Sequence, residues 1–284
     1  MLELRNITKV YNPGTVTEQT LFRDALVTQL AMDMGGNMPL QRYRYCVLYI
    51  NGEYFGIYAI REPMDELYYA QREAVTEADV TILEEPTPYA SDLQSLAAFC
   101  ESHDLTQQEH YDYVSAQLDV DGLIDWLILQ GYSCNGDIGG NLRYFSDGSR
   151  WKQGLYDLDG AFYDHSGFAN VFSGEEPYQF LTIASSLIRN EDFRESFLER
   201  LGEELEGTLG NDHVLGRIDE FAALLAPEIA RERERWGGFV EQWEADVARI
   251  RTYLTRYDHE GLLVESLRAS IGLTDEEAER YFGR

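Results

Sequence analysis

Lysine is almost absent from this sequence of 284 residues. Only Lys9 and Lys152 occur, so arginine supplies nearly all of the 23 basic side chains, against 51 acidic ones. The formal net charge of −28 repels phosphate backbones, which excludes sequence-independent binding to nucleic acid. Such acidity favours solubility, a basic partner or cations. The alternative is that the surface charge only keeps the protein molecules from associating and has no role in binding.

Cysteine is scarce as well, and its spacing excludes a disulfide framework. Cys46, Cys100 and Cys134 are widely separated and form no CxxC pair. We interpret them as buried thiols, because Cys46 falls in an apolar strand and Cys100 on a helix. A nucleophilic role for Cys134 is disfavoured, since no histidine lies near it in the sequence.

Long apolar runs are missing too. No stretch of about 18 apolar residues occurs, so we expect no transmembrane segment. No signal peptide is recognisable, and the opening MLELRN reads like the inside of a strand. We therefore expect that sequence upstream of this opening is missing from the chain. The apolar content of 44% is nevertheless sufficient for a folded core.

Two β-hairpins are the clearest local predictions. Asn51-Gly52 lies between segments rich in Val, Ile, Tyr and Phe, and both residues tolerate the positive φ of a tight turn. Asp147-Gly148 occupies the same place within LRYFSDGSRWKQGLY. A lone strand is expected in DVTILEEP, residues 79–86.

Helical periodicity predicts most of the remainder. Apolar residues four apart from Phe22 to Met34 predict a helix that ends at Gly35-Gly36, and Pro63 suits the first turn of another. Further helices are expected at about 91–103, 106–117 and 119–131, and from residue 180 to the end. The expected fold is therefore α+β, with a small α/β portion over 1–90 and a mostly helical lobe over 91–284.

The segment from residue 135 to residue 160 holds an unusual number of side-chain oxygens. If GLYDLD is extended, Asp157 and Asp159 point to the same face and repel each other unless a cation lies between them. Mg²⁺ suits such a pair, because it prefers carboxylate oxygens and leaves room for water and phosphate. The alternative is a surface DxDG turn whose carboxylates only cap backbone N–H groups.

Asp137 and Asn141 form the other half of this segment, in a stretch rich in glycine that lets a backbone approach a ligand closely. In phosphoryl transfer, one aspartate orients the attacking hydroxyl, while an asparagine and a later aspartate hold Mg²⁺. The order of residues here fits that chemistry. A structural Ca²⁺ loop, or simple capping of the next strand, is the alternative.

Five blocks resemble the spore coat protein H kinases (the CotH kinase family) in order and spacing. They are LRN at 4–6, FRDAL at 22–26, VLYINGEYFGIYAIREPMD at 47–65, NGDIGGNLRYF at 135–145 and LYDLDGAF at 155–162. The resemblance implies a divergent protein-kinase-like fold that binds ATP with Mg²⁺ or Mn²⁺ and phosphorylates Ser or Thr hydroxyls of a protein. It also implies an extracellular, cell-surface or spore coat setting.

By this resemblance Asp137 corresponds to the catalytic aspartate and Asn141 to the metal-binding asparagine. Asp159 or Asp157 corresponds to the metal-binding aspartate, and Gly160 after it favours Asp159. Asp137 and Asn141 are four residues apart, whereas five separate the corresponding pair in ordinary protein kinases, so the analogy to those enzymes is loose.

Nucleotide-binding roles are expected for Arg5, Glu62 and Lys152. Glu62 follows the GIYAI strand, where the family has an acid, although a first-turn glutamate favoured by the helix dipole is equally consistent. Arg5 suits phosphate or carboxylate by its planar fork, and it could equally be structural. Lys152 is the lysine nearest the acidic segment.

A kinase normally binds the nucleotide phosphates with a lysine on an N-terminal strand. Because lysine is scarce here, the sequence does not identify the residue that supplies this positive charge. Arg42, Arg44 and Arg61 are possible substitutes, with a different geometry. A non-catalytic, nucleotide-binding or scaffold pseudokinase is therefore the main alternative. Metal-dependent transfer of a glycosyl or nucleotidyl group, with the aspartates of DLD as metal ligands, is a third interpretation. For the kinase interpretation, we expect a basic, serine-rich protein substrate, because the chain itself is strongly acidic.

Overall fold

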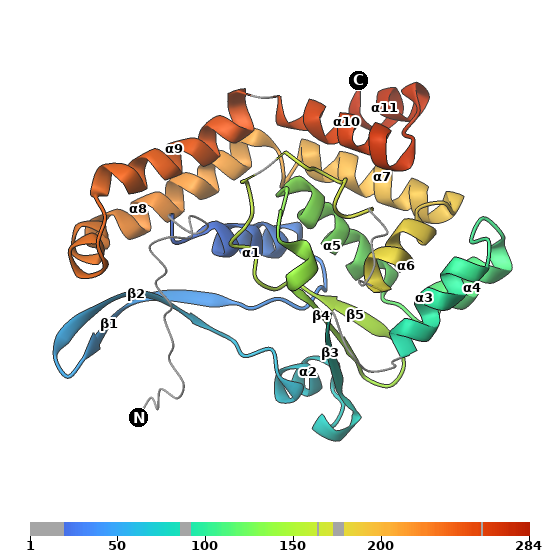
Figure 1. Ribbon diagram of the computed structural model, residues 1–284, viewed down its shortest axis with the longest axis horizontal. Coiled ribbons are helices and arrows are strands. Elements are labelled where there is room, and N and C mark those ends of the chain that lie inside the picture. Colours follow the sequence, from blue (N-terminus) through green and yellow to red (C-terminus); the bar gives the residue numbers. More distant parts are fainter. Residues whose placement is uncertain (1–19, 86–91, 164, 173–178, 257) are drawn as a thin grey trace.

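The computed structural model describes residues 20–85, 92–163, 165–172, 179–256 and 258–284, and it confirms an α+β fold (Figure 1). The elements in chain order are α1 (Arg23–Met34), β1 (Tyr43–Ile50), β2 (Glu53–Arg61), α2 (Glu66–Glu73), η1 (Glu77–Asp79), β3 (Thr81–Glu85), α3 (Asp92–Ser102), α4 (Gln108–Ser115), α5 (Val120–Tyr132), η2 (Ile138–Gly140), β4 (Leu142–Ser146), β5 (Trp151–Gly154), α6 (Gln179–Leu187), α7 (Glu191–Glu206), α8 (Asn211–Trp236), α9 (Val240–Arg256), α10 (His259–Ile271) and α11 (Asp275–Phe282).

The first hairpin forms as predicted. Strands β1 and β2 pair antiparallel, and their turn holds Asn51 at φ 53° and Gly52 at φ 84°. A side chain other than Gly or Asn would be strained in two successive positive-φ positions, so this dipeptide sets the register. A bulge between Leu48 and Tyr49 shifts the pairing near the turn.

Helix α8 supports one face of this hairpin. The ring of Phe221 on α8 lies 5.9 Å from that of Tyr43 and stacks on Phe22 at the start of α1 at 5.3 Å. Further along, fully buried Glu232 accepts a hydrogen bond of 2.7 Å from the Ile57 backbone N–H. The hairpin is therefore fixed to the helical body both by apolar packing and by a charge-assisted hydrogen bond.

The second sheet has the strand order β3-β4-β5, with all pairs antiparallel. The prediction of a lone strand was wrong on this point, because β3 pairs with β4, from Thr81 opposite Ser146 to Glu85 opposite Leu142. The β4–β5 hairpin is confirmed. This sheet joins a strand from the N-terminal part of the chain to the hairpin that follows Asn141.

Helices make up most of the remaining described chain. Figure 1 shows α7 to α11 gathered on one side and both sheets, with α2, on the other, while α1 and α5 run between them. Helix α1 ends at Gly35 with φ 72°, as predicted. Helices α3 and α4 fall within the expected ranges, and α5 ends one residue beyond its expected range, at Tyr132. The predicted boundary at residues 90/91 lies outside the described residues and stays a prediction, as does the strand expected at MLELRN.

Helix α2 begins later than predicted. Asp65 is its N-cap and accepts a hydrogen bond of 2.9 Å from the Tyr68 N–H, so the helix starts at Glu66. Glu62 and Pro63 therefore lie in the connection before the helix, and neither belongs to its first turn. Cys100 and Cys134 are buried and Cys46 is half-buried, and none of the three forms a disulfide with another described residue. Within the described parts of the chain, no helix is both long and apolar enough to cross a membrane.

Candidate active site

Helix α5 delivers the chain into the acidic segment. It is buried along nearly its whole length and ends at Tyr132. Just beyond, Asn135 is 2% exposed, and its side-chain amide donates to Gln130 Oε1 at 3.0 Å. Its carbonyl oxygen accepts from the Asp137 N–H at 3.3 Å. Asn135 thus anchors the loop to the helix, while the Asp137 residue remains exposed.

Asn141 connects this loop to the DLDG segment. Its side-chain nitrogen donates to the Asp137 carbonyl at 3.1 Å and lies 3.4 Å from the Asp157 carbonyl. The two segments also meet at Gly160, where an added Cβ would lie 3.0 Å from Asn135 Oδ1 and 3.5 Å from Asp137 Cβ. A larger residue would separate the segments, so glycine at position 160 allows Asp137 and Asp159 to come together.

The expected extended strand through Asp157 and Asp159 is not present. Strand β5 ends at Gly154, and Asp157 has φ 53°, so the two carboxylates do not follow strand alternation. Instead, fully buried Leu158 fixes the segment, and its N–H donates to Asp24 Oδ1 on α1 at 2.9 Å. Buried Arg23 then donates to the carbonyls of Ala161, at 2.6 Å, and Phe162. A turn, held by the start of α1, directs both carboxylates to one side.

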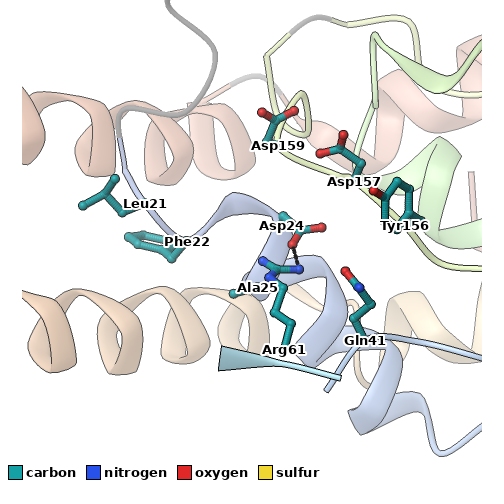
Figure 2. Close-up of a pocket in the computed structure, with 9 residues that line it drawn as sticks. All are labelled: Leu21, Phe22, Asp24, Ala25, Gln41, Arg61, Tyr156, Asp157 and Asp159. Carbon is teal, nitrogen blue, oxygen red and sulfur yellow. Dashed lines mark ion pairs between the residues drawn. The ribbon is translucent and has the colours of Figure 1, made fainter. Parts of the chain in front are cut away.

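Asp157 and Asp159 line a cavity of about 250 Å³ between this turn and the first hairpin (Figure 2). Asp24, which is hydrogen-bonded to this turn, forms an ion pair with Arg61 of the hairpin, and both residues line the cavity. Leu21, Phe22, Ala25, Gln41 and Tyr156 complete the lining. Three carboxylates and one guanidinium therefore face a single space.

Burial and mutual repulsion both act on these carboxylates. Partial burial, followed by the charges of Asp159, Asp24 and Asp137, raises the pKa of the Asp157 carboxyl to about 6. Burial, then the charges of Asp24 and Asp137, also raises the pKa of Asp159. Raised pKa values in a cleft are typical of functional carboxylates, and a bound cation would relieve the repulsion.

The donor atoms fit a magnesium–nucleotide site better than a closed metal cage. Among the described residues, no group of three or more His, Cys, Asp or Glu side chains is arranged to hold an ion. Mg²⁺ bound together with a nucleotide needs only one or two carboxylates, because phosphate oxygens and water complete its shell. Asp157, Asp159 and the Asn141 amide are the oxygen ligands available here.

Lys152 and Glu62, which were also predicted to bind nucleotide, are not among the described residues that line this cavity. The Lys152 ammonium forms an ion pair with Glu73 on α2, and both side chains are largely covered. Glu62 is exposed and contributes its backbone, with its N–H donating to the Arg42 carbonyl at 3.1 Å. Arg5 lies outside the described residues. Asp24 and its pairing with Arg61 were missed, although both residues fall within the FRDAL and IREPMD blocks.

Comparison with known proteins agrees with the resemblance of the five sequence blocks to the CotH kinase family. The family model described as CotH kinase protein matches residues 12–86 and 82–258. None of the curated proteins matches the chain. The family match covers most of the chain, including both hairpins, the Asp137–Asn141 loop and the DLDG turn, and so the chain belongs to the CotH kinase family.

Proposed function

We propose that this protein is an ATP- and Mg²⁺-dependent protein kinase that transfers the γ-phosphoryl group to Ser or Thr hydroxyls. The observation that carries the proposal is that the loop of Asp137 and Asn141 meets the turn of Asp157 and Asp159, and that the latter two line one cavity. Membership in the CotH kinase family supports phosphotransfer in general. The arrangement of hairpin, acidic loop and DLDG turn supports a kinase-like fold.

In this mechanism Asp137 orients the substrate hydroxyl and accepts its proton. The hydroxyl oxygen forms a bond to the γ-phosphorus, the bond to the β–γ bridging oxygen breaks, and ADP leaves. Asp137 suits this role because it is exposed and its N–H is fixed by Asn135. A bound Mg²⁺ would neutralise phosphate charge, and Asn141, Asp157 and Asp159 would hold it.

The charge of the whole chain supports a basic, serine-rich protein as substrate. A net charge of −28 attracts cationic segments and raises their local concentration. We also propose that this activity is located outside the cell, at its surface or in a spore coat. Turnover of acidic and basic peptides at equal rates would contradict the substrate preference.

Single-residue variants test the phosphotransfer proposal. The protein is incubated with labelled ATP, Mg²⁺ or Mn²⁺ and a serine-rich basic peptide. Asp137→Asn should lower the rate of labelling about 10²–10⁴-fold, the range that a positioned acid–base group contributes. Asp159→Asn should also lower the rate, because it removes a carboxylate that would hold Mg²⁺. Asp121→Asn removes an exposed carboxylate from α5 and should leave the rate within about 2-fold of wild type.

A pseudokinase is the second candidate, and the position of Lys152 favours it, because this lysine does not line the cavity. The same experiment separates the two. Absence of label with wild type, combined with a rise in melting temperature on adding Mg²⁺ and ATP together, would support the pseudokinase.

A further inference from the structure

We propose that Arg61 is the residue that binds the nucleotide phosphates, in the role that a lysine has in other kinases. The inference rests on the proposed function, because it assigns one residue within the same site. Arg61 is the last residue of β2, at the edge of the cavity opposite the DLDG turn (Figure 2).

The hairpin register turns Arg61 toward the cavity. Arg61 pairs with Tyr43, and directly opposed residues share a face, so Arg61 lies on the face that Tyr43 packs toward α8. Arg44 pairs with Ile60 on the opposite face. The register therefore directs Arg61, and not Arg44, to the side where the helices and the acidic turn lie.

The Arg61 side chain is 29% exposed, so a ligand can reach it. Its NH1 nitrogen pairs with Asp24 Oδ2, and the described residues provide no other hydrogen-bond acceptor for its guanidinium. A guanidinium carries five N–H donors in a planar fork that matches phosphate oxygens. The unused part of this fork is available for phosphate.

Asp24 holds Arg61 in position without blocking it. One Asp24 oxygen, Oδ1, accepts from the Leu158 N–H, and the other, Oδ2, pairs with Arg61. A single carboxylate thus ties the end of the hairpin to the turn that carries Asp157 and Asp159. Because the two contacts use different oxygens, Arg61 can move toward a ligand while the Leu158 contact stays in place.

The other cations near the site are already engaged. Arg23 is 1% exposed and donates to the carbonyls of Ala161 and Phe162. Lys152 pairs with Glu73. Within the described chain, Arg61 is the one cationic side chain that lines the cavity, and it lies opposite the carboxylates that suit a divalent ion. This places positive charge on one wall and metal ligands on the other, as a metal-bound triphosphate requires.

The test compares the affinities for bare Mn²⁺, Mg·ATP and adenosine in folded variants of the full chain. Arg61→Met should weaken Mg·ATP binding at least 10-fold, leave adenosine binding unchanged and leave Mn²⁺ binding equal or tighter, because a positive charge beside the carboxylates is gone. Arg61→Lys should recover part of the loss. Arg44→Met, which removes the same charge from the opposite face, should match wild type in all three measurements.

Asp24→Asn should change the Mg·ATP affinity in the opposite direction to Arg61→Met. It keeps a side-chain oxygen for the Leu158 N–H but releases Arg61, so Mg·ATP affinity should stay equal or rise. An ion pair with a structural role alone would make Arg61→Met and Asp24→Asn equally harmful, which would overturn the inference. Equal Mg·ATP affinity in Arg61→Met and wild type would overturn it as well, while leaving phosphotransfer intact. A wild-type protein that binds no Mg·ATP would overturn both the inference and the proposed function.

Discussion

Among single residues, Asp157 is the one whose ionisation opposes folding most clearly. Its pKa is raised from 3.8 to about 6, so at pH values well below 3.8 the carboxyl is protonated in both folded and unfolded states. As the pH rises through 6, the folded protein must ionise it beside Asp159, Asp24 and Asp137, and the stability that protonation provided is lost.

Asp157→Asn should therefore stabilise the metal-free protein at pH 7.5 and much less at pH 4. The pKa shift corresponds to at most about 3 kcal/mol, and solvent screening of this exposed residue reduces the expected gain to about 1 kcal/mol. Urea denaturation with EDTA at both pH values measures it. Glu234→Gln, on an exposed position of α8, is the control. An equal gain at both pH values would contradict the assignment of the effect to ionisation.

Lys152 provides a second prediction at this scale. Because its ammonium is paired with Glu73 and lies away from the cavity lining, Lys152→Met should change Mg·ATP affinity by less than about 2-fold. The same variant leaves the largely covered Glu73 carboxylate with only the longer contact of 3.7 Å to the Arg72 guanidinium, which should cost about 2 kcal/mol of unfolding free energy. Isothermal titration and denaturation measure the two quantities. A large loss of nucleotide affinity without a loss of stability would restore the role predicted from sequence.

The site residues that lie close together in the sequence could be predicted from it, whereas those that lie far apart in the sequence could not. Asp137 and Asn141 are close in the chain, and Asp157 and Asp159 flank a buried leucine. The sequence therefore predicted these four residues as members of the site. Asp24 lies on a distant helix, and only folding places its carboxylate against the Leu158 N–H. The choice of Glu73 as the partner of Lys152 is equally non-local.

Among elements, the attachment of the first hairpin to α8 depends strongly on Glu232. This residue is fully buried, and its Oε2 atom accepts from the Ile57 N–H at 2.7 Å and from Tyr54 OH at 3.4 Å. Glu232→Ala removes the acceptor and should lower the unfolding free energy by about 2–3 kcal/mol. Glu232→Gln keeps an acceptor oxygen and should cost less. Glu234→Ala, exposed on the same helix, should stay within about 0.5 kcal/mol of wild type.

The element predictions failed where tertiary contacts override local pattern. The DLDG segment alternates like a strand, but Leu158 and Asp24 hold it in a turn. The segment around β3 was predicted to be a lone strand, because its partner β4 lies far along the chain. Turn dipeptides and apolar periodicity, by contrast, act within a few residues, so both hairpins and α1 were predicted correctly.

For the whole molecule, self-repulsion is the main long-range electrostatic effect. Ion pairs such as Arg217 with Asp33 are local, while the net charge of −28 acts over the entire surface. Raising NaCl from 20 mM to 500 mM should therefore increase the melting temperature by about 2–4 °C, which corresponds to ~1 kcal/mol. Calorimetry measures the shift, with sucrose as an uncharged comparison. A lower melting temperature at high salt would show that local ion pairs dominate.

The shared sheet of β3, β4 and β5 has a practical consequence for dividing the protein. Each half of a chain cut near residue 90 would hold an incomplete sheet, since β3 would leave with one piece and β4 and β5 with the other. The Leu155 N–H, bonded to the Pro39 carbonyl at 2.8 Å, would also lose its acceptor. Neither piece should fold alone, but the two co-expressed should reassemble, which suits this protein to a split reporter whose signal depends on complementation.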